Sequence, residues 1–215
     1  MLESVLRVRA GYAAPFRERI KPGGGEMAKR WRRRMGVMIL CSMAGTTLML
    51  ALQGRIREAV PLHLCSVSAL LAAVLSLKKS PAILDFLWYL GMPGAVLALI
   101  FPAPASSVMQ PLFTAGYVLT HAMIAAIPLI AFAMGEEPRR GTAPTQLMAL
   151  QPLALTAFFV NRALGTDFLF LAAPPQDTPL TRVWELGYPA YILLLQGMML
   201  GLCLLMSVAH RLLFK

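Results

Sequence analysis

Six apolar segments, each about long enough to cross a lipid bilayer as a helix, dominate this chain of 215 residues. A helix that crosses a hydrocarbon core about 30 Å thick needs about 20 mostly apolar residues. Only 14% of the residues are charged, against about a quarter in soluble domains, while 58% are hydrophobic. The pattern predicts an all-α fold, a polytopic membrane helix bundle with six transmembrane helices. We expect the spans at residues 35–53, 60–77, 83–101, 113–134, 146–164 and 186–209.

Charged residues and helix breakers separate the six segments, as expected of connecting loops. The third span carries Asp85 near one end and Pro93 in its middle, which predicts a kink. We expect the chain to have two parts, a basic N-terminal segment at residues 1–34 and a six-helix transmembrane domain at residues 35–215.

The distribution of lysine and arginine predicts the orientation, because cytoplasmic loops of membrane proteins are enriched in both residues. With the N-terminus inside, the inner side holds 16 of the 20 basic residues and the outer side holds 4. Ten of those 20 lie in residues 1–34. The asymmetry therefore predicts that both termini are cytoplasmic, with the N-terminus in and the C-terminus in.

A basic cluster made of Lys29, Arg30, Arg32, Arg33 and Arg34 stands directly before the first span. A net charge of +10 in a soluble protein would suggest a nucleic-acid partner, but here the charge is concentrated beside a membrane segment. Such a cluster is typical of a topology signal and of contact with anionic lipid. We expect membrane lipids as partners, with anionic headgroups at the basic N-terminal segment, and no nucleic acid. The oligomeric state stays open.

Three polar residues within the spans are candidates for a site, because such residues are costly in lipid. At a rise of about 1.5 Å per residue, Cys65 lies about 8 Å below the outer start of the second span. His121 lies about 10 Å below the outer start of the fourth, and Asn161 about 6 Å from the outer end of the fifth. Three spans thus place a thiol, an imidazole and an amide in one outer-leaflet layer.

These three groups can carry out nucleophilic chemistry. A thiolate attacks an acyl group, an imidazole takes its proton, and an amide orients the ring or binds an oxyanion. We predict Cys65, His121 and Asn161 as catalytic residues, and His63 and Ser68 as substrate-binding residues. On a regular helix Cys65 and Ser68 share a face, whereas His63 and Cys65 point in nearly opposite directions. Each polar group can instead serve only packing between helices.

The three cysteines, Cys41, Cys65 and Cys203, are odd in number and far apart in the sequence. Their spacing fits neither a disulfide framework nor a metal-binding motif. We therefore predict no metal site and no cofactor, with a Cys-His metal or haem site as the alternative.

From about residue 37 to the C-terminus the chain resembles the YwaF-like family of bacterial integral membrane proteins. The resemblance rests on Pro61-Leu62-His63-Leu64-Cys65 at the opening of a span, on Thr120-His121, and on the segment from Asn161 through Gly165-Thr166-Asp167 to Leu171. That family is related to a eukaryotic multi-span family to which lipid acyltransferase activity is attributed. The resemblance implies that Cys65 and His121 form the working pair.

Two functions stay open at this point, and with them the question whether the chain is an enzyme. One is an intramembrane Cys/His acyl-transfer enzyme that acts on lipids. The other is a non-enzymatic membrane protein, a small carrier or an assembly factor, with a polar outer-leaflet binding pocket. In either case we expect a multi-pass protein of the bacterial inner (plasma) membrane.

Overall fold

The computed structural model describes residues 22–101, 110–175 and 178–213, and within these ranges every regular element is a helix. Five stretches are long and apolar enough to cross a membrane. They are Lys29–Leu52 in α2 (Pro22–Leu52), Pro81–Ile100, Pro111–Ala133 in α6 (Gln110–Ala133), α7 (Ala143–Leu164) and Tyr188–Leu213, which is α9. The short elements are η1 (Ile56–Ala59), α3 (Leu64–Leu77), η3 (Phe168–Phe170) and α8 (Leu180–Trp184).

The second predicted span, residues 60–77, is shorter in the structure than expected. Only Leu64–Leu77 is helical, and its 14 residues rise about 21 Å, less than the hydrocarbon core. The residues before Leu64 leave the helix because His63 has an extended backbone, with φ −70° and ψ 147°. Five long helices and one short one therefore stand where six spans were predicted, and the count of six is not confirmed.

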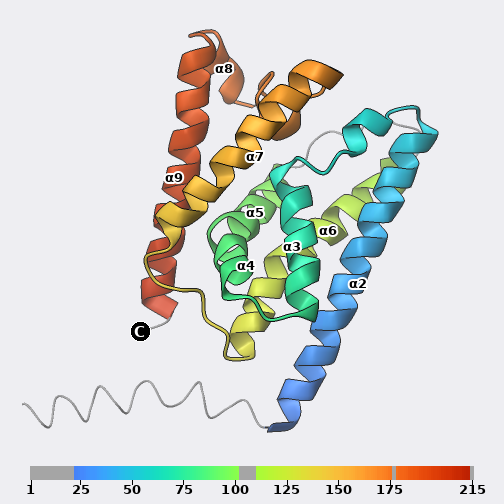
Figure 1. The fold of residues 1–215 in the computed structure, drawn as a ribbon, viewed down its shortest axis with the longest axis vertical. Coiled ribbons are helices and arrows are strands. Elements are labelled where there is room, and N and C mark those ends of the chain that lie inside the picture. The colour runs from blue at the N-terminus through green and yellow to red at the C-terminus, as the bar shows by residue number, and fades with distance from the viewer. Residues whose placement is uncertain (1–21, 102–109, 176–177, 214–215) are drawn as a thin grey trace, which may run out of the picture.

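The bundle has a central helix with helices on both sides of it (Figure 1). One group consists of α2, α3 and α6, whose shared core includes Ile39, Ala73 and Ile124. The pair α7 and α9 lies on the other side and packs on the central helix around Trp88 and Cys203. The predicted membrane bundle is thus present, and the short helix α3 is one of its innermost parts.

The central helix, Pro81–Ile100, contains a π-helical turn at Leu87–Gly91. This turn, named η2, separates α4 (Pro81–Phe86) from α5 (Met92–Ile100). Pro93, at which a kink was predicted, lies in the first turn of α5 directly after η2. A proline removes one backbone N–H, and a π-helical turn is one of the irregularities that accommodates such a break.

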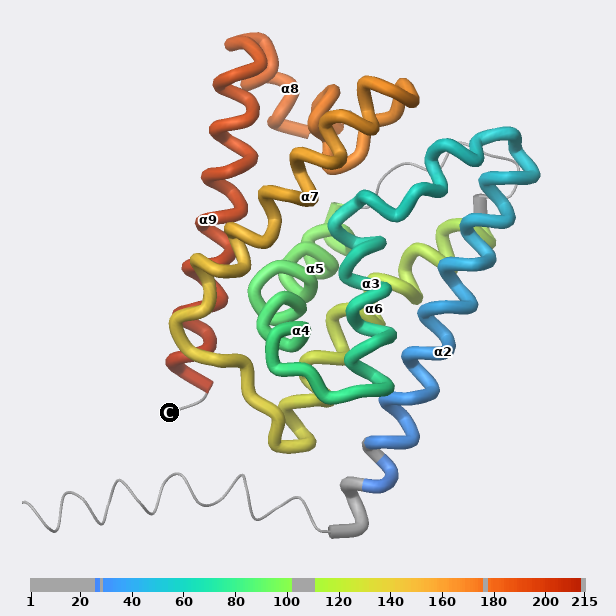
Figure 2. Tube along the Cα trace, viewed as in Figure 1, coloured from blue at the N-terminus to red at the C-terminus, as the bar shows by residue number. Residues whose placement is uncertain are grey.

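One end of the bundle gathers the segments that were predicted to share the cytoplasmic side. Figure 2 shows the start of α2, the end of α3, the α6–α7 connection and the end of α9 at the same end. Ion pairs join them: Arg32 to Glu136 at 2.6 Å and Arg139 to Asp85 at 2.7 Å. Helix α2 runs without a break from Pro22 through residue 34, so its basic residues are continuous with the first span. The side of the membrane that this end faces stays a prediction.

Helices α2 and α3 approach closely at Gly36, so a larger residue at this position should disturb their packing. A Cβ atom placed on Gly36 would lie 1.7 Å from Oγ and 2.7 Å from Cβ of Ser76, so rotating that side chain cannot relieve the clash. We expect Gly36→Ala to lower the free energy of unfolding by about 2 kcal/mol. Unfolding by SDS in mixed micelles measures it. Gly45→Ala, on the same helix with nothing within 4 Å, is the control and should leave stability nearly unchanged.

Candidate functional site

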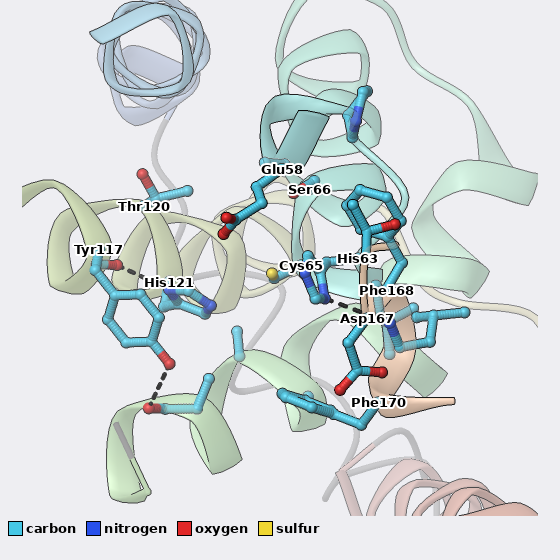
Figure 3. A pocket seen from close by; sticks show the side chains of 18 of the residues that line it. Glu58, His63, Cys65, Ser66, Tyr117, Thr120, His121, Asp167, Phe168 and Phe170 are labelled. Carbon is cyan, nitrogen blue, oxygen red and sulfur yellow. Dashed lines mark hydrogen bonds between the residues drawn. The ribbon is translucent and has the colours of Figure 1, made fainter. Parts of the chain in front are cut away.

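A cavity of about 1000 Å³ lies among the helices, and we call it the Cys65 cavity. Its wall includes residues of α2, α3, α5, α6, α7 and α9, together with the loop after α7. Three of the five predicted site residues line it: Cys65, His121 and His63. In the view of Figure 3 the sulfur of Cys65 lies between the rings of His121 and His63. The cavity therefore brings most of the predicted site residues together.

The start of α3 explains why His63 and Cys65 both reach the cavity. On a regular helix two residues this far apart would point in nearly opposite directions. Here the helix begins at Leu64, and His63 precedes it in the extended conformation. Since the backbone turns between the two residues, both side chains line the same cavity.

His121 is held in one tautomer by its own helix. Its Nδ1 lies 2.8 Å from the carbonyl oxygen of Tyr117, one turn earlier in α6. A carbonyl only accepts, so Nδ1 carries the hydrogen and Nε2 has the lone pair. The centroid of the ring lies 4.1 Å from that of Tyr117, with the two planes tilted by 38°. The Tyr117 hydroxyl donates to the carbonyl of Ala98 at 3.0 Å. Nε2 of His121 is thereby placed as a proton acceptor.

His63 is held in the opposite tautomer. Its Nδ1 accepts a hydrogen bond from the backbone N–H of Leu169 at 3.4 Å. The hydrogen of the neutral ring is therefore on Nε2, which can donate. The ring packs in a T-shaped arrangement with that of Phe168, with the two centroids 5.1 Å apart. The cavity thus contains one imidazole prepared to accept a proton and one prepared to donate a hydrogen bond.

The loop that bonds His63 has an unusual backbone. Leu169 and Phe170 both have positive φ, 58° and 55°, a region that residues other than glycine rarely adopt. Such conformations persist only where the surroundings fix them, and they cluster at functional sites. The Tyr191 hydroxyl donates to the carbonyl of Phe170 at 2.7 Å. Residues 165–172, which we call the strained loop, all line the cavity.

Asn161 holds the strained loop and is not among the residues that line the cavity. Its Oδ1 accepts from the backbone N–H of Phe168 at 2.7 Å and from the hydroxyl of Thr166 at 3.1 Å. Its Nδ2 donates to the carbonyl of Phe168 at 3.0 Å. Both ends of the amide are thus bonded to the loop and do not face Cys65 or His121.

Ser68 also lies away from the cavity, although it shares a helix face with Cys65. Its side chain is fully buried, and a Cβ on Gly91 of η2 would lie 3.1 Å from its Oγ. That oxygen has no hydrogen-bond partner among the described residues. The position fits close packing of α3 on the central helix.

Two carboxylates, Glu58 and Asp167, line the cavity with His63. Burial raises the pKa of Asp167, while backbone hydrogen bonds from Ala172 and Ala173, and the charge that His63 carries when it is protonated, oppose the change. Burial lowers the pKa of His63, against the charges of Asp167 and Glu58. His63 is therefore neutral near pH 7, as its hydrogen bond from Leu169 requires. Within the described ranges no three His, Cys, Asp or Glu residues are grouped to hold a metal ion.

Nothing in the sequence pattern singled out Glu58, Tyr117 or the aromatic residues of the strained loop as parts of the site. Tyr117 lies one helical turn before His121, which is the one local signal for their contact. The strained loop reaches His63 from more than 100 positions away, so only the fold brings them together.

A protein-family model, that of the TMEM164 family, matches residues 16–207. No curated protein and no solved structure matches the chain. The resemblance to the YwaF-like family was therefore wrong. The matched region begins in the basic segment, about 20 residues before the similarity that the short motifs indicated. Short polar motifs at the ends of spans identify families poorly, because capping and loop formation draw on the same few residues.

Proposed function

The chain belongs to the TMEM164 family, and we propose that this multi-pass membrane protein is an intramembrane acyl-transfer enzyme that acts on lipids through Cys65. One observation carries the proposal. Cys65 shares a cavity with two histidines whose backbone hydrogen bonds fix them in opposite tautomers. A pocket that only binds a ligand does not require a proton acceptor and a hydrogen-bond donor beside a thiol.

In the first step the sulfur of Cys65 attacks the carbonyl carbon of a lipid acyl ester. Nε2 of His121 takes the thiol proton, and Nε2–H of His63 donates to the oxygen that becomes negative. The carbon–oxygen bond of the ester then breaks. The lipid alcohol leaves with the proton from His121, and the acyl chain stays on Cys65 as a thioester.

In the second step the hydroxyl of another lipid attacks the thioester. His121 takes the hydroxyl proton and returns it to the sulfur as the carbon–sulfur bond breaks. The products are a new lipid ester and the Cys65 thiol. Apolar residues such as Leu64, Leu150 and Met199 line much of the cavity. They suit acyl chains and disfavour water, so transfer is favoured over hydrolysis.

The other two predicted site residues receive supporting roles in this proposal. Asn161 is a positioning residue, because it fixes the strained loop that in turn bonds His63. Ser68 packs α3 against the central helix.

We also propose that the bundle end with the basic segments faces the cytoplasm, as the distribution of 16 and 4 basic residues favours. The Cys65 cavity then opens toward the outer leaflet. Location in a bacterial inner membrane stays a prediction, because charge asymmetry of this kind is typical of multi-span proteins in any cell.

Trapping the thioester tests the proposed function. Purified protein in nanodiscs is incubated with a phospholipid that carries a fluorescent acyl chain, quenched in acid and digested. We expect the label on the peptide that contains Cys65, released by neutral hydroxylamine as a thioester is. Cys65→Ser should carry no hydroxylamine-sensitive label.

Cys41→Ser is the matched control, since Cys41 is exposed and is not among the residues that line the cavity. It should label as the wild type does. Label on Cys41 alone, or no thioester in a protein that still binds the lipid, would contradict the enzyme. The second result would favour the alternative of a lipid-binding pocket without chemistry.

A further inference from the structure

The first turns of α2 carry arginines on two different faces, and these faces have different surroundings. Arg32 points into the protein, with its residue 5% exposed and its Nη1 2.6 Å from Glu136. Arg30, Arg33 and Arg34 point outward and are exposed. Residues three and four apart share a helix face, whereas residues two apart do not. Of the four arginines in the basic cluster, Arg32 is therefore structural and the other three form one exposed triad.

None of the three exposed arginines forms an ion pair within the described residues, although the charge of Glu26 attracts that of Arg30. The neighbouring carboxylate of Glu26 pairs with Lys29 at 2.6 Å, and Glu136 pairs with Arg32. The guanidinium group of Arg34 lies over the aromatic ring of Trp31, at 5.7 Å from the ring centroid. Within the described residues, the triad therefore keeps most of its positive charge uncompensated.

The triad lines a shallow, largely apolar groove of about 450 Å³ together with Val37 and Met38. These two side chains, which we call the apolar floor, are 52% and 45% exposed. Both lie at the start of the apolar part of the span, one helical turn from the arginines. The groove therefore offers guanidinium groups at one end and a hydrocarbon surface at the other.

We propose that this groove binds an anionic phospholipid of the adjacent leaflet. The guanidinium fork matches phosphate oxygens in geometry and charge. Long arginine side chains reach from the helix to the headgroup level, while an acyl chain lies along Val37 and Met38. Trp31, 55% exposed beside Arg34, suits the same interfacial depth. A nucleic acid would use the three charges but would gain nothing from the apolar floor.

Lipid competition on the full chain tests the proposal. Protein purified in neutral detergent is equilibrated with equal amounts of phosphatidylglycerol and phosphatidylcholine, and bound lipids are counted by native mass spectrometry. We expect the wild type to retain phosphatidylglycerol preferentially. Arg30→Gln/Arg33→Gln/Arg34→Gln should lower that preference at least about tenfold, and Arg33→Gln alone about threefold. The single variant decides the matter if the triple variant does not fold.

The matched control removes the same charge at the other end of the bundle. Arg57→Gln/Arg162→Gln/Arg182→Gln neutralises three exposed arginines and should keep the preference. The proposed site would be overturned if both triple variants lost the phosphatidylglycerol preference equally, or if neither groove variant lost it. Binding of a labelled DNA duplex that depends on the triad, with no lipid preference, would overturn the lipid assignment. None of these results depends on acyl transfer.

Discussion

His121→Asn is expected to slow acyl transfer between lipids about a thousandfold, because it removes the base that takes the Cys65 proton. Asparagine places an N–H near the position of Nδ1, so the hydrogen bond to the carbonyl of Tyr117 can persist. It has no counterpart of Nε2. The substitution thus separates the base from the packing role of the ring. The assay follows a fluorescent acyl chain from a donor phospholipid to a lysophospholipid in nanodiscs.

His210→Gln is the control for loss of a buried histidine. His210 lies in α9 at the opposite end of the bundle, and its Nε2 is 2.7 Å from the carbonyl oxygen of Pro138. A glutamine N–H can replace that contact, so the transfer rate should stay within about twofold of wild type. A wild-type rate in His121→Asn, with His210→Gln unchanged, would remove His121 from the mechanism.

Glu136→Ala is expected to lower the free energy of unfolding by about 3 kcal/mol, because it leaves the charge of Arg32 buried and unpaired. The side chains of Arg32 and Glu136 are only 6% and 11% exposed, and their atoms approach to 2.6 Å. Lys79, which is 3.5 Å from Glu136, is largely exposed, so its ion pair adds little to the free energy of unfolding. Unfolding by SDS in mixed micelles, followed by tryptophan fluorescence, measures the loss.

Glu137→Ala is the control for this prediction, since Glu137 is adjacent and exposed. Its free energy of unfolding should change by less than about 0.5 kcal/mol. The double variant Arg32→Leu/Glu136→Leu should recover much of the stability, because apolar side chains can replace a buried ion pair. Equal losses of unfolding free energy in Glu136→Ala and Glu137→Ala would show that the ion pair with Arg32 does not stabilise the fold.

Hydropathy placed the long helices well. The predicted spans at 35–53, 83–101, 113–134, 146–164 and 186–209 each fall within a helix that is long enough to cross a membrane, to within a few residues at most ends. The segment 60–77 is as apolar, but α3 is short because the backbone of His63, directly before it, is extended and carries the side chain to the cavity. Hydropathy reports how apolar a segment is and cannot report such a local change in the backbone.

The candidate site was likewise predicted only in part. Depth along the helices pointed to Cys65 and His121, and both line one cavity. The same argument placed Asn161 in that layer, yet its amide is bonded to the strained loop. Depth fixes one coordinate of a residue, whereas the direction of its side chain depends on neighbours that are distant in the sequence.

The sequence by itself indicated an all-helical membrane protein and the five helices that are long and apolar enough to cross a bilayer. It could do so because the cost of charge and of unpaired backbone in lipid acts on each segment separately. Only the tertiary structure decided the tautomer of His63, the burial of Arg32 against Glu136 and the exposure of its three neighbouring arginines. Each of these depends on a contact or a free space between elements, and no local pattern of residues encodes it.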